Sequence, residues 1–234
     1  MTLQKFPSRK FVKSALTIAS IAILTSAVGL AQTYSNLDTT AGWTSCNGCA
    51  GGSTFSEPHS LSMASSPSLD GSALKFSIFP TRSYSNTLWY KAISPTSASH
   101  LTYDFYVFFK NTWDPQALEF DIMEGNSGRG HTFGTECKPG MRLWKIWGFG
   151  RWNNSVTCDM KAGRWNHVTW EFSHANGGTQ FVAVTVNGIK RYVNRTFPSN
   201  STGAFYLHPS VQLDGNLNRT AYSIWVDKLS VHAF

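Results

Sequence analysis

The residues best suited to chemistry are three acids within six positions of one predicted strand. They lie in the segment Glu119-Phe-Asp-Ile-Met-Glu124. Because side chains alternate along a strand, Glu119 and Asp121 share a face, and Glu124 points to the other face unless the strand is irregular. We expect a one-residue bulge near Met123 to return Glu124 to the face of the other two acids. Hydrolysis of a glycosidic bond requires carboxyl groups with unequal proton affinities, so this cluster predicts a site that acts on sugars.

The same acids also fit two interpretations without catalysis. In the first, they bind the hydroxyl groups of a sugar that is not cut. In the second, their role is structural: Glu119 and Asp121 hydrogen-bond the backbone or an arginine, and Glu124 is solvated at the end of the strand. The nearest arginines in the sequence are Arg129, Arg142 and Arg151.

Tryptophans near the acidic strand predict a second part of a sugar site, because indole faces stack on the apolar faces of sugar rings. Trp144 and Trp147 fall on opposite faces of a predicted strand. We therefore expect only one of them to face a groove and the other to pack in the core. Trp113, before the acidic strand, and His131, after it, are further candidates for substrate contacts. A structural role is the alternative for His131.

The acidic segment carries a resemblance to a known family. Glu119-Phe-Asp-Ile-Met-Glu124 resembles the E-x-D-x-x-E pattern of the bulged catalytic strand in laminarinase-type enzymes of glycoside hydrolase family 16. Trp113 and Pro115 resemble the Trp-Pro approach to that strand. The last predicted strand, Trp225-Val-Asp-Lys-Leu-Ser-Val-His232, is similar to the closing strand of concanavalin A-like lectin and glucanase domains. As a whole, the chain resembles uncharacterised secreted bacterial lectin-like proteins.

The resemblance implies a concanavalin A-like jelly roll and a retaining endo-hydrolysis of a β-linked glucan. In that mechanism Glu119 is the nucleophile, Asp121 orients it, and Glu124 is the acid/base. The lectin-like resemblance implies the alternative, a non-catalytic module that binds wall or matrix polysaccharide. Some related sandwiches hold a structural Ca²⁺, for which Asp227 is the candidate ligand here. The position of Glu124 separates enzyme from lectin, because only the enzyme needs it across the sugar from Glu119.

The remaining sequence predicts an all-β protein. After Leu74, short segments rich in aromatic and β-branched residues alternate with turns, and apolar residues do not keep a helical spacing for long. Asn187-Gly188 between two such segments is a strong hairpin signal. We therefore expect one domain over residues 32–234, built as a β-sandwich of two antiparallel sheets. Its strands are expected at 74–79, 88–91, 101–110, 117–123, 142–148, 166–172, 180–186, 189–194, 205–213 and 222–233.

The N-terminal segment predicts export. Basic residues precede an apolar run over 15–30, and Gly29 and Ala31 are the small residues that signal cleavage requires. We expect a signal peptide over 1–31 and a mature protein that is extracellular or periplasmic, without membrane attachment after cleavage. An uncleaved membrane anchor is the alternative.

Charge and histidine spacing argue against several other classes of protein. The chain has 20 Lys and Arg, 13 Asp and Glu and a net charge of +7, and four of the basic residues lie in the predicted signal peptide. The mature protein therefore has 16 basic and 13 acidic residues, or +3, and no basic run with interleaved aromatics that would indicate nucleic acid. The seven histidines lack metal-ligand spacing, so we expect no catalytic metal and no other cofactor. The expected partner of this monomer is a polysaccharide, with β-glucan favoured.

The four cysteines predict two disulfides, because their number is even and the protein is expected to be exported. We expect Cys46–Cys49 and Cys137–Cys158, since each pair closes a local loop. Cys46 and Cys49 also have the C-x-x-C spacing of redox and zinc sites. A redox motif belongs in a βαβ unit, which is not expected here, and a zinc site needs all four thiolates kept reduced outside the cell.

Overall fold

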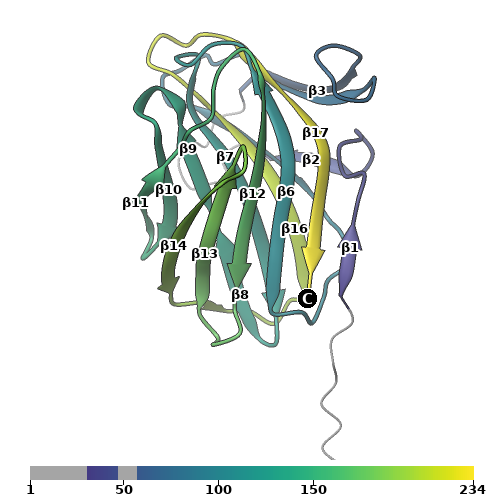
Figure 1. Ribbon diagram of the computed structural model, residues 1–234, viewed down its shortest axis with the longest axis vertical. Helices are drawn as coiled ribbons and strands as arrows, with labels where there is room; N and C mark the ends of the chain where they lie inside the picture. The colour runs from purple at the N-terminus through teal and green to yellow at the C-terminus, as the bar shows by residue number, and fades with distance from the viewer. Residues whose placement is uncertain (1–30, 47–56) are drawn as a thin grey trace, which may run out of the picture.

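The computed structural model describes residues 31–46 and 57–234, which form two antiparallel β-sheets packed face to face (Figure 1). The predicted all-β sandwich is therefore confirmed. Within the described ranges, the helical structure is a single 3₁₀ turn, Pro139–Met141. No helix there is long and apolar enough to cross a membrane.

The first sheet has the C-terminal strand near its centre. Strand β1 (Gln32–Tyr34) pairs with this C-terminal strand, β17. The strands of the sheet, in spatial order, are β14 (Ile189–Phe197), β13 (Thr179–Val186), β12 (Trp165–Ser173), β6 (His100–Phe109), β17 (Tyr222–Ala233), β4 (Ala73–Ile78) and β3 (His59–Ala64).

The second sheet has the acidic strand at its centre. Its strands, in spatial order, are β11 (Arg151–Thr157), β10 (Leu143–Gly148), β9 (Thr135–Lys138), β7 (Pro115–Asn126), β16 (Tyr206–Gly215), β5 (Asn86–Lys91) and β2 (Trp43–Cys46). The C-terminal half of β7 also pairs with β8 (Arg129–Phe133), which in turn pairs with β15 (Asn200–Ser201). Strand β7 is thus held on both edges, by β16 on one side and by β8 and β9 on the other.

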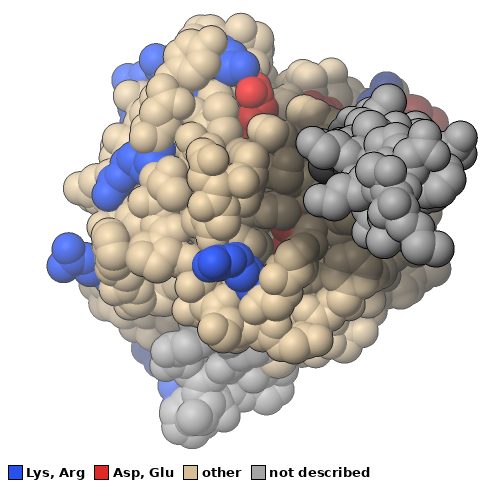
Figure 2. Space-filling model, turned by 90° about the horizontal axis from the view of Figure 1, so that it is seen from below, with Lys and Arg blue, Asp and Glu red and all other residues tan. Residues whose placement is uncertain are grey.

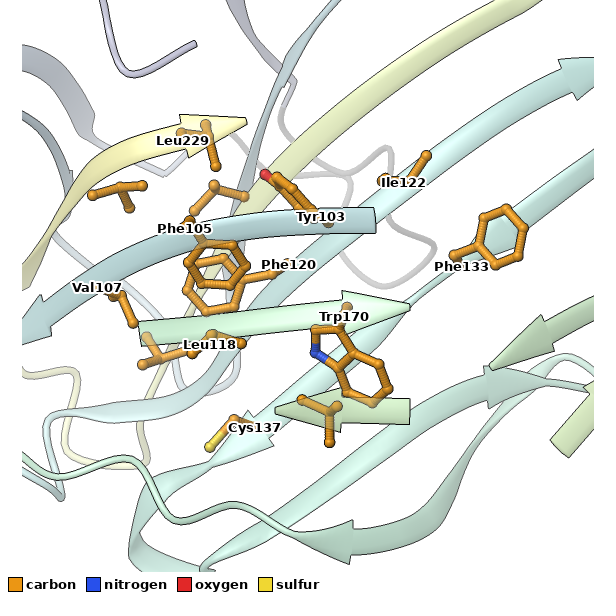
Figure 3. Packing of buried hydrophobic residues seen from close by; sticks show 14 of the residues in the cluster. Tyr103, Phe105, Val107, Leu118, Phe120, Ile122, Phe133, Cys137, Trp170 and Leu229 are labelled. Carbon is orange, nitrogen blue, oxygen red and sulfur yellow. The ribbon is translucent and has the colours of Figure 1, made fainter. Parts of the chain in front are cut away.

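Alternating aromatic side chains fill the space between the sheets (Figure 3). On β6, Tyr103, Phe105, Val107 and Phe109 are each at most 1% exposed, while the residues between them are partly exposed. Phe105 stacks on Phe120 of β7 with ring centroids 4.2 Å apart. Burial of these large apolar surfaces holds the two sheets together, and it fixes which face of β7 points inward.

The register of β7 contradicts the predicted bulge. Pairing with β16 is regular from Ala117, opposite Asp214, through Gly125, opposite Tyr206. The register shift lies at the beginning of the strand, before Ala117, and not near Met123. Side chains therefore alternate without interruption through the acidic segment, which places Glu124 on the inner face with Phe120 and Ile122.

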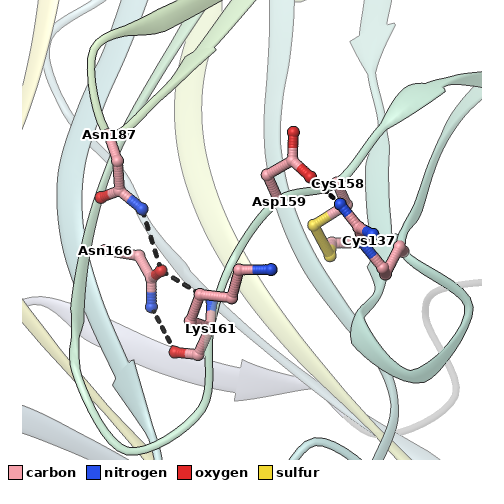
Figure 4. Close-up of a disulfide and its surroundings, with 7 residues drawn as sticks. Cys137, Cys158, Asp159, Lys161, Asn166 and Asn187 are labelled. Carbon is pink, nitrogen blue, oxygen red and sulfur yellow. Dashed lines mark hydrogen bonds and ion pairs between the residues drawn. A yellow bond between two sulfur atoms is a disulfide. The ribbon is translucent and has the colours of Figure 1, made fainter.

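A disulfide and an asparagine pair hold the loops at the edge of the sandwich (Figure 4). Cys137 of β9 is bonded to Cys158, as predicted. Cys46 is also in a disulfide, and its predicted partner, Cys49, lies outside the described residues. Asn187 begins the predicted hairpin turn between β13 and β14 and donates a hydrogen bond to the side-chain oxygen of Asn166 at 3.2 Å.

Candidate functional site

A cleft of about 720 Å³ lies on the outer face of the second sheet, opposite the core. The inward side chains of β7 belong to the core, whereas the alternate side chains line the cleft. The cleft has polar side chains on its floor and aromatic side chains along its walls. The lining residues are Asn86, Leu88, Tyr90, Glu119, Asp121, Met123, Thr132, Gly134, Trp147, Trp152, His208, Gln212 and Asp214.

Three carboxyl groups form the floor of the cleft. Glu119 is 3% exposed and Asp121 is 7% exposed. Asp214 reaches them from the neighbouring strand β16, where it hydrogen-bonds the carboxyl group of Glu119 and accepts a bond from Nε2 of Gln212 at 2.9 Å. Gln212 lies directly opposite Glu119 in the sheet, so strand pairing brings these groups together.

The floor carboxyls hold protons unusually tightly. Burial, with the charges of Asp214 and Asp121, raises the pKa of Glu119 well above its ordinary value. Burial also raises the pKa of Asp121 to about 8, although the backbone N–H of Thr135, which donates to it at 2.7 Å, acts in the opposite direction. Burial and the charge of Glu136 raise the pKa of Asp214 to about 7. Near neutral pH, the floor therefore contains both proton donors and proton acceptors.

A fourth acid, Glu136 of β9, lies beside the floor and is paired with lysines. It faces Glu119 across the strand pair and is 3% exposed. Its Oε1 lies 3.0 Å from Nζ of Lys138 and 3.8 Å from Nζ of Lys145. Burial lowers the pKa of Lys145. These two cations neutralise Glu136 at the edge of the site, and neither of them lines the cleft.

Aromatic rings stand at two places along the cleft. At one, the ring centroids of Tyr90 and His208 lie 5.2 Å apart on the adjacent strands β5 and β16. At the other, the ring centroids of Trp147 and Trp152 lie 5.4 Å apart on the paired strands β10 and β11. Burial lowers the pKa of His208, which favours its neutral form. Such rings offer flat apolar faces above a polar floor, which is the combination that a sugar ring requires.

The tryptophans predicted to contact a substrate occupy three different environments. Trp147 lines the cleft, whereas Trp144 is fully buried and packs edge-on against Trp170 at 5.1 Å. The alternation of side chains had predicted one groove-facing and one core-facing ring. Trp113 is 73% exposed and lies outside the cleft lining, over Gly140.

Glu124 and His131 also lie away from the cleft, between the two sheets. Glu124 is fully buried, forms an ion pair with Nε2 of His174 at 3.2 Å and accepts a hydrogen bond from Asn126 at 3.3 Å. His131 is 2% exposed, stacks on His174 at 4.6 Å and contacts Thr179. Because β7 has no bulge near Met123, Glu124 does not face Glu119, and the acid/base position predicted for it is not formed.

Sequence reasoning missed the contribution of strand β16. His208, Gln212 and Asp214 occur at even spacing, which is the signal of a polar strand face. The sequence therefore indicates a polar face on this strand, but it does not show that this face of β16 lies beside Glu119. Asn86 and Tyr90 were missed for the same reason, because their strand, β5, joins the site only through pairing with β16.

Within residues 31–46 and 57–234, no group of three or more His, Cys, Asp or Glu has an arrangement that would hold a metal ion. Oδ2 of Asp227, the candidate calcium ligand, accepts a hydrogen bond from the backbone N–H of Leu69 at 2.7 Å.

Comparisons with known proteins define the class of fold. Arcelin-5, a lectin-like defense protein from Phaseolus vulgaris, is similar over 87% of this chain and 98% of its own, with 10% identity and a TM-score of 0.56. The globular domain of T. cruzi calreticulin is similar over 86% of this chain and 87% of its own, with 8% identity and a TM-score of 0.52. A sialidase is similar over 81% of this chain, which spans 17% of the sialidase, with 14% identity and a TM-score of 0.50. No protein-family model and no curated protein sequence matches the chain. The protein thus has a lectin-like β-sandwich fold.

Proposed function

We propose that the protein binds a polysaccharide in the cleft of the second sheet. The observation that carries this proposal is the cleft itself, in which two aromatic pairs flank a floor of carboxyl and amide groups. Aromatic faces take up the apolar faces of sugar rings, while the floor exchanges hydrogen bonds with their polar substituents. The cleft is open and long enough to be lined by six strands, which fits a chain rather than a single sugar.

A calorimetric binding experiment tests this proposal. The protein is titrated with soluble β-1,3, β-1,4 and mixed-linkage glucans, and then with amino-sugar polymers. Replacing Trp147 by Ala removes a stacking surface from the cleft and should weaken binding about tenfold. Trp113→Ala is the matched control, because this exposed ring lies outside the cleft. Absence of binding to every polymer, or equal effects of the two substitutions, would contradict the proposal.

Hydrolysis of the bound chain is the second candidate function. The observation in its favour is the hydrogen bond between Glu119 and Asp214, in which Glu119 holds the proton. Glu119 then fits a general acid, and not the ionised nucleophile that the family resemblance implies. Asp214, with a pKa of about 7, is the better base. Binding is the first proposal, because burial raises the pKa of all three floor carboxyls, whereas a retaining mechanism needs an ionised nucleophile.

Release of reducing sugar distinguishes the two candidates. For an enzyme, wild type should release reducing ends from at least one glycan that it binds. Glu119→Gln and Asp214→Asn should each abolish this release while leaving the glycan bound. An unchanged reducing-end count after prolonged incubation, with binding intact, would exclude hydrolysis of that glycan.

We also propose that the protein works outside the cytosol. The Cys137–Cys158 bond is typical of proteins from oxidising compartments, and this supports the export predicted from the N-terminal segment. Expression of the full sequence in a secreting host should yield mature protein that begins at Gln32. N-terminal sequencing of the culture fluid checks this, and retention of the intact N-terminus in the membrane fraction would contradict it.

A further inference from the structure

We propose that the polysaccharide bound in the cleft carries positively charged amino groups, as chains of unacetylated glucosamine do. The inference rests on the proposed function and specifies its ligand. It follows from the kinds of hydrogen-bonding atoms on the cleft floor and from the signs of charge around them.

The floor of the cleft is rich in acceptors and poor in cationic donors. Glu119, Asp121 and Asp214 contribute carboxyl oxygens from two adjacent strands. Among the described residues that line the cleft, none is Lys or Arg. The nearest lysines on this face, Lys138 and Lys145, are bound to Glu136. A polysaccharide of uronic acids would therefore find no Lys or Arg among these residues to pair with its carboxylates.

Two amide oxygens on the same floor lack hydrogen-bond partners among the residues that the structure describes. Oε1 of Gln212 and Oδ1 of Asn86 are buried and unpartnered, and the two residues are 2% and 7% exposed. The amide nitrogen of Gln212 is already used, since it donates to Asp214, so its oxygen remains to accept a bond. Asn86 lies directly opposite Asp214 on strand β5. A buried acceptor without a donor is costly, and both oxygens line the cleft, so a ligand that brings donors would satisfy them.

An ammonium group matches this floor better than the other substituents of a sugar. It offers three donors and no acceptor, whereas a hydroxyl offers one donor and two acceptors. Its hydrogen bonds to carboxylates are charge-assisted and about twice as strong as neutral ones. The aromatic pairs at Tyr90–His208 and Trp147–Trp152 favour a chain of sugar rings over a lysine-bearing peptide as the source of the amine.

Binding of the amine should release protons from the floor. Asp121 and Asp214, with pKa values of about 8 and 7, hold protons in the free protein, and a nearby positive charge lowers both pKa values. Below pH 7 these protons must be removed before the charges can pair, so affinity for the amine should fall as pH falls. Affinity for an uncharged glycan of the same linkage should lack this dependence.

Three β-1,4-linked pentasaccharides, of glucosamine, N-acetylglucosamine and glucose, separate the ligand classes in calorimetry at pH 6, where the amino groups of glucosamine are protonated. The glucosamine pentamer should bind at least about tenfold more tightly than the glucose pentamer. It alone should release protons, detected as a binding heat that changes with the ionisation enthalpy of the buffer. Asp214→Asn should reduce the preference for the amine. The matched control, Glu171→Gln, changes an acid of the other sheet that pairs with Lys190 and should leave the preference unchanged.

The outcomes distinguish this inference from the proposed function. If the glucose pentamer binds as tightly as the glucosamine pentamer, the inference is wrong and the proposed function stands. If a pentamer of lysine binds as tightly as the glucosamine pentamer, the amine is recognised without the sugar, which also overturns the inference. If none of these ligands and no polymer of the wider panel binds, the proposed function fails. The proton-release measurement uses the unmodified protein, so it decides the question even if Asp214→Asn fails to fold.

Discussion

The two faces of strand β7 use acidic side chains in opposite ways. On the outer face, Glu119 and Asp121 lie with a third carboxyl group, and mutual crowding and burial raise the pKa of each. On the inner face, Glu124 is sealed between the sheets and paired with His174. Burial acts to lower the pKa of His174, but the hydrogen bond and charge of Glu124 outweigh it and raise this pKa. Among the described residues that line the cleft there is no Lys or Arg to pair with the outer acids, whereas the inner acid is buried and paired with His174.

The surroundings of the acids on the two faces distinguish a candidate binding site, on the outer face, from a structural contact, on the inner face. Carboxyls crowded together in a buried place cost stability, and such arrangements are typical of functional sites. A buried ion pair, in contrast, holds two elements in one arrangement, here β7 and the segment that follows β12. Glu119 and Glu124, five positions apart on one strand, therefore have two unrelated roles, and each role can be tested by substitution.

The two tryptophans of β10 give the largest expected contrast between an inner and an outer face. Trp144→Ala should lower the free energy of unfolding by about 3–5 kcal/mol, because it leaves a cavity in the core. Trp147→Ala should lower it much less while weakening glycan binding. Urea unfolding followed by fluorescence measures the first effect. Equal loss of stability in the two variants would show that the faces of β10 are not distinct.

Removal of the inner acid is expected to have the next largest effect. Glu124→Gln leaves the buried His174 without its counter-charge and should cost about 3 kcal/mol of unfolding free energy. The matched outer substitution, Glu119→Gln, relieves carboxyl repulsion and should leave stability unchanged or raise it. Urea titrations at one pH compare the two. A greater loss for Glu119→Gln than for Glu124→Gln would reverse the roles assigned to the two faces.

The pH dependence of stability provides the smallest and finest test. Folding raises the pKa of Asp121 from 3.8 to about 8, so the folded protein binds this proton more tightly than the unfolded chain. The free energy of unfolding therefore falls as pH rises through this window. Asp121→Asn removes this dependence, so relative to wild type the variant should be more stable at pH 8 than at pH 5.

His131, between the two sheets, should make the stability respond to pH with the opposite sign. Burial and the charge of His174 lower the pKa of His131 to about 4 in the folded state. The stability that His131 contributes in its neutral form is therefore lost as pH falls from 6.5 towards 4. Asp121→Asn should not alter this loss of stability at acid pH. Urea unfolding curves of wild type and variant, measured between pH 4 and pH 8, separate the effect of Asp121 at high pH from that of His131 at low pH. A variant curve parallel to that of wild type over the whole range would show that Asp121 does not titrate as described.

Local patterns in the sequence predicted a large part of the fold. Alternation along β6 identified its inward face, Asn187-Gly188 marked the hairpin, and the loop between Cys137 and Cys158 indicated their disulfide. Such features depend on residues close together in the chain, where side-chain period and turn chemistry act directly. The same alternation placed Glu119 and Asp121 on one face.

Tertiary structure alone decided the composition of the site. Whether β7 contains a bulge near Met123 depends on its pairing with β16 and β8, and regular pairing on both edges kept Glu124 inward. The third floor acid is instead Asp214, which the sequence places far from Glu119 and the sheet places within hydrogen-bonding distance. Register between distant strands is set by burial of the inner side chains of both sheets together, so no local segment contains this information.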